Sequence, residues 1–153
     1  IKDKGTNKKH LKILSKFWKT IGSNIVIMDA KKHDAIFSMT SHLPHLIAYN
    51  LVKTAQEYEK SKKYDLIKFS AGGLRDFSRI AASNEIMWRD IFLSNDENIK
   101  KAIDLFIKNL NLFKRDIKLK NDKILIKKLK ETKKVRKKIV ISKLDTDKLD
   151  FGR

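Results

Sequence analysis

The sequence predicts a mainly α-helical protein that begins with a fragment of an α/β unit. Apolar residues recur at helical spacing along most of the chain, whereas one short run rich in β-branched residues, at 24–28, is typical of a buried strand. The 153 residues correspond to one domain with a hydrophobic core, and a hydrophobic content of 41% argues against disorder throughout.

The first segment combines a helix with this strand. Residues 8–21 carry apolar side chains, Trp18 among them, at helical spacing, and Gly22 is suited to end the helix. A helix leading into a buried strand is half of a parallel α/β unit, and one strand cannot form a sheet. Because the chain starts at Ile1 without Met or a signal peptide, we expect the rest of the sheet upstream. The alternative is that residues 24–28 are helical.

A long helix is predicted from Asp34 to about Lys60, with Pro44 inside it. The proline removes an intrahelical hydrogen bond and should kink the helix beside two histidines. Residues 71–73 form the one glycine-rich loop, and a short helix is expected at 77–82.

The second half of the chain is also predicted to be helical. Ser83 and Asn84 can cap a helix over 85–93. A longer helix starts at residues 95–97, and its apolar stripe over 99–113 predicts a core or subunit interface. Residues 121–140 continue as a helix dominated by lysine, and we expect a frayed tail over 142–153.

The formal net charge of +18 suggests a partner such as nucleic acid or an anionic membrane. However, residues 114–153 alone carry +10, and the abundance of Lys, Ile and Asn is also what an AT-rich genome produces. The absence of cysteine excludes disulfides and thiolate metal sites. No apolar run approaches the roughly 18 residues of a membrane span, so we expect a cytoplasmic protein that binds no membrane.

Two clusters of side chains could bind a small anion. His42 and His45 lie three residues apart, so on a helix they share a face. Such a pair can bind a metal ion or the hydroxyls or carboxylates of a ligand. Alternatively, the two histidines are only capped or partly buried side chains beside the kink. No nearby Glu completes a familiar metal motif, and a third metal ligand from His33 or Asp34 would have to reach across helical turns. We therefore predict no metal site. His10 is expected to be solvated.

The second cluster follows Gly72 and Gly73. Arg75 and Arg79 share a helical face, and an arginine fork can hold a carboxylate by two hydrogen bonds. Asp76 could hold the Arg79 guanidinium in place, although an ordinary surface ion pair is the alternative. The glycines can form a simple turn or let backbone amides approach a ligand, but their spacing fits no dinucleotide loop. Trp88 is interpreted as a core residue, and no complete catalytic set is visible.

Several motifs in this order resemble the prephenate dehydrogenase family, which includes the arogenate and cyclohexadienyl dehydrogenases. They are HD at 33–34, SHLPH at 41–45, AGGLRDFSRIA at 71–81, and MWRDIFL at 87–93 followed by Asn95. The resemblance covers about residues 8–113. It implies an N-terminal Rossmann domain for NAD or NADP, a C-terminal helical domain that forms a homodimer, and oxidative decarboxylation of prephenate or arogenate toward tyrosine.

By this resemblance, residues 1–30 are the last helix and strand of the Rossmann domain, and residues 31–118 are the helical substrate and dimerisation domain. Residues 119–153, a lysine-rich helical extension and tail, lie outside the resemblance. The residues it implies for substrate binding are His45, Arg79, His42 and Gly73. The supporting residues are Asp76, Arg75 and Trp88.

The resemblance places the catalytic histidine and the dinucleotide loop upstream of Ile1. We therefore expect no catalytic or cofactor-binding residue in this chain, which alone should be inactive. Tyrosine is an expected inhibitor. Two alternatives stay open: a basic helical nucleic-acid-binding protein, which we disfavour because the lysine-rich tail lacks interleaved aromatic residues, and a stand-alone regulatory module that binds tyrosine.

Overall fold

The computed structural model describes residues 1–142, which form helices joined by short turns and contain no strand. The elements are α1 (Lys8–Thr20), α2 (Ala30–Phe37), the π-helical turn η1 (Ser38–His42), α3 (Leu43–Lys62), the 3-10 turn η2 (Ile67–Phe69), α4 (Gly72–Ala81), α5 (Glu85–Ser94), α6 (Asp96–Lys118) and α7 (Asp122–Ile141). The mainly α class is confirmed. Of the tail expected over 142–153, residues 143–153 lie outside the described residues.

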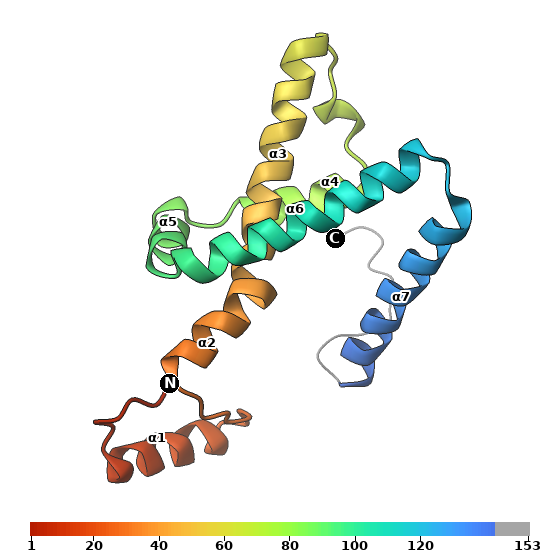
Figure 1. Ribbon diagram of the computed structural model, residues 1–153. Helices are drawn as coiled ribbons and strands as arrows, with labels where there is room; N and C mark the ends of the chain where they lie inside the picture. Colours follow the sequence, from red (N-terminus) through yellow and green to blue (C-terminus); the bar gives the residue numbers. More distant parts are fainter. Residues whose placement is uncertain (143–153) are drawn as a thin grey trace.

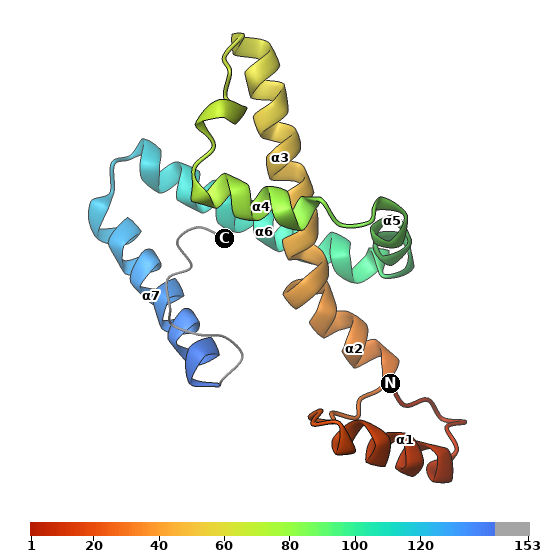
Figure 2. The same cartoon turned by 180° about the vertical axis from the view of Figure 1, so that it is seen from behind.

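One long helical rod organises the molecule. The elements α2, η1 and α3 follow one another without a break. Helices α4 and α6 cross α3 on opposite sides, as the front and back views show (Figures 1 and 2). Helix α7 turns back from the far end of α6, and α1 lies beyond the start of α2. The arrangement is open, with crossing helices rather than a closed bundle.

Asparagine and aspartate side chains start several of these helices. Asn7 Oδ1 accepts hydrogen bonds from the Lys9 and His10 backbone amides at the start of α1. Asp29 accepts one from the Lys32 amide at α2, and Asn84 accepts one from Met87 at α5, as predicted. Each cap satisfies an amide that has no partner within its helix, which fixes where the helix begins.

The sequence places Pro44 inside a helix, and the chain accommodates it with a π-helical turn. In η1 the Leu43 amide donates to the Ser38 carbonyl, five residues back. Pro44 follows in the first turn of α3. Because a π turn widens the helix, it relieves the contact that a proline ring makes with the preceding turn. The expected disturbance beside His42 and His45 is therefore present, in the form of a π turn.

Two expectations about local structure need correction. Residues 23–29 have no regular secondary structure, so the strand predicted at 24–28 is not formed. A strand needs a neighbouring strand for its backbone hydrogen bonds, and the described residues supply none. The glycine-rich loop and the short helix at 77–82 are likewise one element, because α4 already begins at Gly72. Gly22, by contrast, follows α1 with φ at 88°, as its role in ending the helix requires.

The core of the described residues is small for so many apolar side chains. The buried apolar residues are Leu43, Ala48, Trp88, Ile99 and Ala102. Many others are exposed, including Leu105, Leu110 and Ile117 on α6. Large exposed apolar surface on a folded chain is typical of an interaction site, such as a protein interface or a ligand groove. No helix among these residues is both long and apolar enough to cross a membrane.

A buried ion pair attaches α7 to α6. The Asp116 carboxylate is 2% exposed and accepts a hydrogen bond from Lys128 Nζ, with Arg115 Nε 3.6 Å away. Lys128 Nζ also lies 5.1 Å from the centre of the Phe113 ring. The hydrogen bond from Lys128 holds the pKa of Asp116 below its usual value, despite the opposing effect of burial. No sequence spacing reveals this pair, because α6 and α7 meet only in the folded chain.

Replacing Asp116 by Asn should loosen α7 selectively. A carboxylate with a lowered pKa stabilises the folded state above its unfolded pKa of 3.8, and this contribution is lost as the pH falls through the lower folded pKa. We expect Asp116→Asn to speed amide hydrogen exchange in α7 at pH 7 and the difference from the wild type to shrink below pH 3.8. The control is Lys127→Met on the exposed side of α7. Equal amide exchange rates in the two variants would contradict the role of the Asp116–Lys128 pair in holding α7 against α6.

Candidate functional site

The rings of two histidines and a tryptophan, which come from different helical elements, form one cluster, called here the ring stack. The imidazole of His45 stacks on the Trp88 indole, with ring centres 3.8 Å apart and an angle of 21° between the planes. The His42 ring meets the same indole edge-on, at 6.2 Å. Trp88 is 5% exposed, and its Nε1 has no hydrogen-bond partner among the described residues. The interpretation of Trp88 as a core residue agrees with this burial, and α5 brings it against both predicted site histidines.

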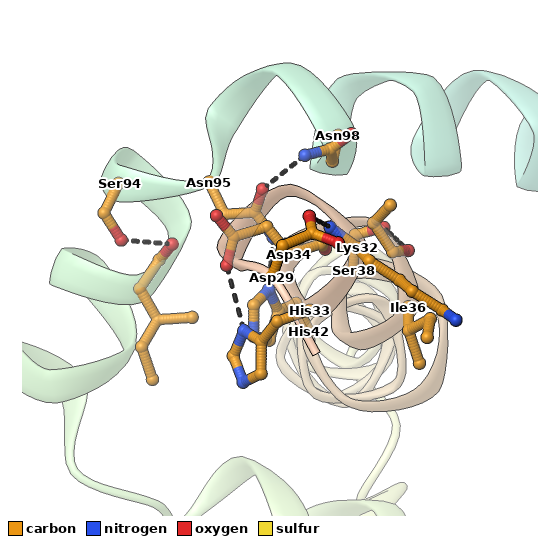
Figure 3. Close-up of polar contacts among 12 residues, drawn as sticks. Asp29, Lys32, His33, Asp34, Ile36, Ser38, His42, Ser94, Asn95 and Asn98 are labelled. Atoms are coloured by element: carbon orange, nitrogen blue, oxygen red, sulfur yellow. Dashed lines mark hydrogen bonds and ion pairs between the residues drawn. The ribbon is translucent and has the colours of Figure 1, made fainter. Parts of the chain in front are cut away.

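Asn95, at the junction of α5 and α6, connects this cluster to the helical rod. Its Nδ2 donates to the Asp34 carbonyl at 2.8 Å and lies 3.2 Å from His42 Nδ1. Its Oδ1 accepts a hydrogen bond from Asn98 at 2.8 Å. Figure 3 shows the Asn95 side chain beside Asp34 and Asn98 at the start of α6. Every hydrogen-bonding group of this buried amide is therefore in use.

The two site histidines are held by different partners. His45 Nδ1 lies 3.0 Å from the Ser41 carbonyl, one turn back along the helix. Burial lowers the pKa of His42, and the nearby imidazoles of His33 and His45 lower it further, while the Asp34 carboxylate acts in the opposite direction. The pKa of His42 therefore lies below the ordinary value of 6.5, which favours the neutral imidazole near pH 7.

The remaining histidines lie outside this ring stack. His33 pairs with the neighbouring Asp34 carboxylate at 3.0 Å and its ring lies 4.4 Å from the Phe37 ring, between centres. His10 is exposed on α1. Over residues 1–142, no group of three or more histidine and carboxylate side chains is placed to hold a metal ion.

The predicted anion-binding cluster on α4 faces solvent. Arg75, Asp76 and Arg79 are exposed, and within residues 1–142 their side chains make no ion pair and no hydrogen bond. The expected support of Arg79 by Asp76 is therefore not formed. Arg89 behaves differently, because its guanidinium pairs with Asp90 at 2.8 Å. The Arg79 guanidinium keeps all its donors available for an external anion.

Packing anchors α4 against α3 through its other face. Leu74, Phe77 and Ile80 are partly buried, and Tyr49 on α3 donates a hydrogen bond to the Ser83 carbonyl just after α4. Helix α4, which carries Arg79, is therefore packed against helix α3, which carries His45. It shows no direct contact between Arg79 and the ring stack of His42, His45 and Trp88.

The glycines that open α4 are not required by packing within this chain. A Cβ placed on Gly72 or Gly73 would meet no atom within 4 Å. Both residues lie in the first turn of the helix, where backbone amides lack partners inside the helix. An open hollow of about 660 Å³ lies between the end of α3 and the start of α4, and Tyr64, Phe69 and Leu74 are among the residues that line it.

Sequence reasoning missed the role of Asn95. The sequence marked it only as the start of a helix and as part of a motif. Its contacts with Asp34 and His42 span 61 and 53 residues, so no local spacing could reveal them. The one available signal was a side-chain amide at the predicted junction of two helices, and such residues more often cap a helix.

Comparisons with known proteins place the chain in a family. Residues 29–131 match the family model "Prephenate dehydrogenase, dimerization domain", which extends beyond the limit at residue 113 expected from the motifs. Cyclohexadienyl dehydrogenase of Zymomonas mobilis is 37% identical over 123 residues, covering 80% of this chain and 42% of that protein. Prephenate dehydrogenase of Lactococcus lactis is 34% identical, covering 85% of this chain and 36% of that protein.

A solved structure agrees with these relatives. The crystal structure of Aquifex aeolicus prephenate dehydrogenase in complex with hydroxyphenyl propionate and NAD+ has a TM-score of 0.83 and 43% identity. The alignment covers 90% of this chain and 48% of that one, so the chain spans less than half of the relatives it matches. This chain belongs to the prephenate dehydrogenase family and matches that family's dimerization domain.

Proposed function

We propose that this chain is the C-terminal portion of an NAD(P)-dependent prephenate or arogenate dehydrogenase, in which it supplies contacts to the substrate carboxylate and the dimer interface. The observation that carries this proposal is the match of residues 29–131 to the family's dimerization domain, because that range contains the histidine and arginine motifs together. Oxidative decarboxylation of such a substrate serves tyrosine biosynthesis, and the proposal includes tyrosine as an inhibitor.

The proposed substrate contacts divide between the two helices. Arg79 has no partner among the described residues and suits a carboxylate, to which an arginine fork can donate two hydrogen bonds. His42, whose pKa is lowered by burial, and His45, whose Nδ1 lies 3.0 Å from the Ser41 carbonyl, both contact Trp88 and suit polar groups of the same molecule. Gly73 leaves space at the start of α4, where a substrate could approach the backbone. Arg75 and Asp76 flank this surface.

The proposed partner is a second copy of the chain. Leu105, Leu110 and Ile117 on α6 are between 47% and 63% exposed, which is unusual for apolar side chains of a helix that crosses the centre of the fold. The family description and this uncovered surface both favour a homodimer. Within residues 1–142 the Arg79 side chain makes no hydrogen bond or ion pair with the ring stack, and the proposal is that a second copy or another part of the enzyme helps to enclose the substrate.

The nicotinamide cofactor supplies the hydride acceptor when bound, but the residues of this chain do not fit its binding. The chain contains no G-x-G-x-x-G sequence, and Gly72 and Gly73 open a helix that follows a 3-10 turn rather than a strand. The cofactor site and the catalytic residues are therefore assigned to other parts of the enzyme, and this chain alone should be inactive.

A chimera tests the proposal. This chain would replace the matching portion of the Aquifex aeolicus enzyme, to which it is 43% identical. We expect NAD+ reduction that depends on prephenate or arogenate, whereas the Aquifex portion without a replacement should be inactive. A folded, dimeric chimera that binds NAD+ yet oxidises neither compound would contradict the proposed function.

A further inference from the structure

The chemistry of the Asn95 contacts settles how its amide is oriented. The Asp34 carbonyl can only accept hydrogen bonds, so the Asn95 atom 2.8 Å from it must be the amide nitrogen. The reversed amide would place two oxygens against each other, and it would also lose the hydrogen bond that Oδ1 receives from Asn98. The same nitrogen, with its second hydrogen, lies 3.2 Å from His42 Nδ1.

This orientation determines the protonation of the His42 ring. An N–H group that points at Nδ1 needs a lone pair there, so the proton of the neutral imidazole lies on Nε2. Burial keeps the ring neutral, and the titratable groups around it are Asp34, His33 and His45. Within residues 1–142 the Nε2 position of His42 has no hydrogen-bond partner, and that position is a hydrogen-bond donor.

His45 has the opposite arrangement. Its Nδ1 lies 3.0 Å from the Ser41 carbonyl, which accepts only, so Nδ1 carries a proton, and Nε2 keeps a lone pair whenever the ring carries a single proton. We propose that Asn95 is a positioning residue that fixes His42 in the Nε2–H tautomer, so that His42 and His45 offer a ligand one donor and one acceptor. The tautomers follow from the hydrogen bonds, and their use by a ligand rests on the proposed function.

Nitrogen NMR of the 153-residue chain tests this assignment directly. Two-bond proton–nitrogen spectra of a sample labelled at histidine distinguish the tautomers, and single His→Gln variants of the four histidines assign the signals. We expect the wild type to show His42 as Nε2–H and His45 as Nδ1–H. A wild-type His42 signal with the proton on Nδ1 would overturn the proposal without any variant.

Two variants examine the part played by Asn95. In Asn95→Asp the carboxylate can only accept, so the His42 proton should move to Nδ1. In Asn95→Ala the ring should show both tautomers in exchange. The matched control is Asn98→Ala, which removes a neighbouring amide but leaves both Asn95 donors in place and should preserve Nε2–H. Should Asn95→Asp fail to fold, Asn95→Ala decides: an unchanged Nε2–H signal there would show that Asn95 does not set the tautomer.

The test is independent of the proposed function. The spectra contain no substrate or cofactor, so an inactive chimera would leave the assignment of the tautomers intact. Conversely, an active chimera with a wild-type His42 in the Nδ1–H form would support the dehydrogenase while overturning the role of Asn95.

Discussion

Replacing Arg79 by Ala in the chimeric enzyme should raise the KM for prephenate about 10- to 100-fold, the range expected for one charge-assisted hydrogen-bonding group. Arg79 is exposed and has no partner among the described residues, so the substitution should not disturb the fold. A buried arginine would have a larger effect. The KM for NAD+ should stay unchanged, because the cofactor is assigned to other parts of the enzyme.

Two further variants identify the cause of this loss. Arg79→Lys keeps the positive charge but lacks the planar fork, and we expect an intermediate KM. Arg89→Ala removes a guanidinium that is already paired with Asp90, and it should leave the KM for prephenate near the wild-type value. Steady-state kinetics with each substrate varied in turn would check these values. An unchanged KM for prephenate in Arg79→Ala would remove Arg79 from the proposed site.

Replacing Trp88 by Ala should destabilise the folded chain by about 3–5 kcal/mol, the usual cost of truncating a large buried aromatic side chain. The Trp88 ring is 5% exposed and contacts the rings of His45, His42 and Phe92, so its removal leaves a cavity where α5 meets the rod. Urea unfolding followed by circular dichroism would measure this change at equal protein concentrations, because association also contributes to stability.

The matched controls are Trp88→Phe and Trp18→Ala. Phenylalanine keeps most of the ring contacts, and the lost Nε1 makes no hydrogen bond within residues 1–142, so Trp88→Phe should destabilise much less than Trp88→Ala. Trp18 is 44% exposed on α1, and Trp18→Ala should change the free energy of unfolding of a single chain only slightly. Equal losses for Trp18→Ala and Trp88→Ala would contradict the assignment of Trp88 to the core.

Local physical rules explain why the helices could be read from the sequence. Side-chain caps such as Asn84, and a residue with positive φ such as Gly22, act within a few residues of the helix end they define. The same local reasoning was wrong at 24–28, because a β-branched run becomes a strand only beside another strand. It also placed the start of α4 too late, since two glycines can lie within the first turn of a helix whose other face is packed.

The sequence by itself determined the helical class, the family resemblance and the residues that the family would use. Only the tertiary structure decided which side chains meet: Trp88 stacks on His45, and Asn95 lies between Asp34 and His42. It also formed the pair of Asp116 and Lys128, which no sequence motif had marked. It also left Arg79 without the predicted support from Asp76. The physical reason is the distance in sequence over which each kind of interaction acts. Helix formation depends on neighbours within about four residues, whereas these contacts form only once the helices cross and exclude water between them.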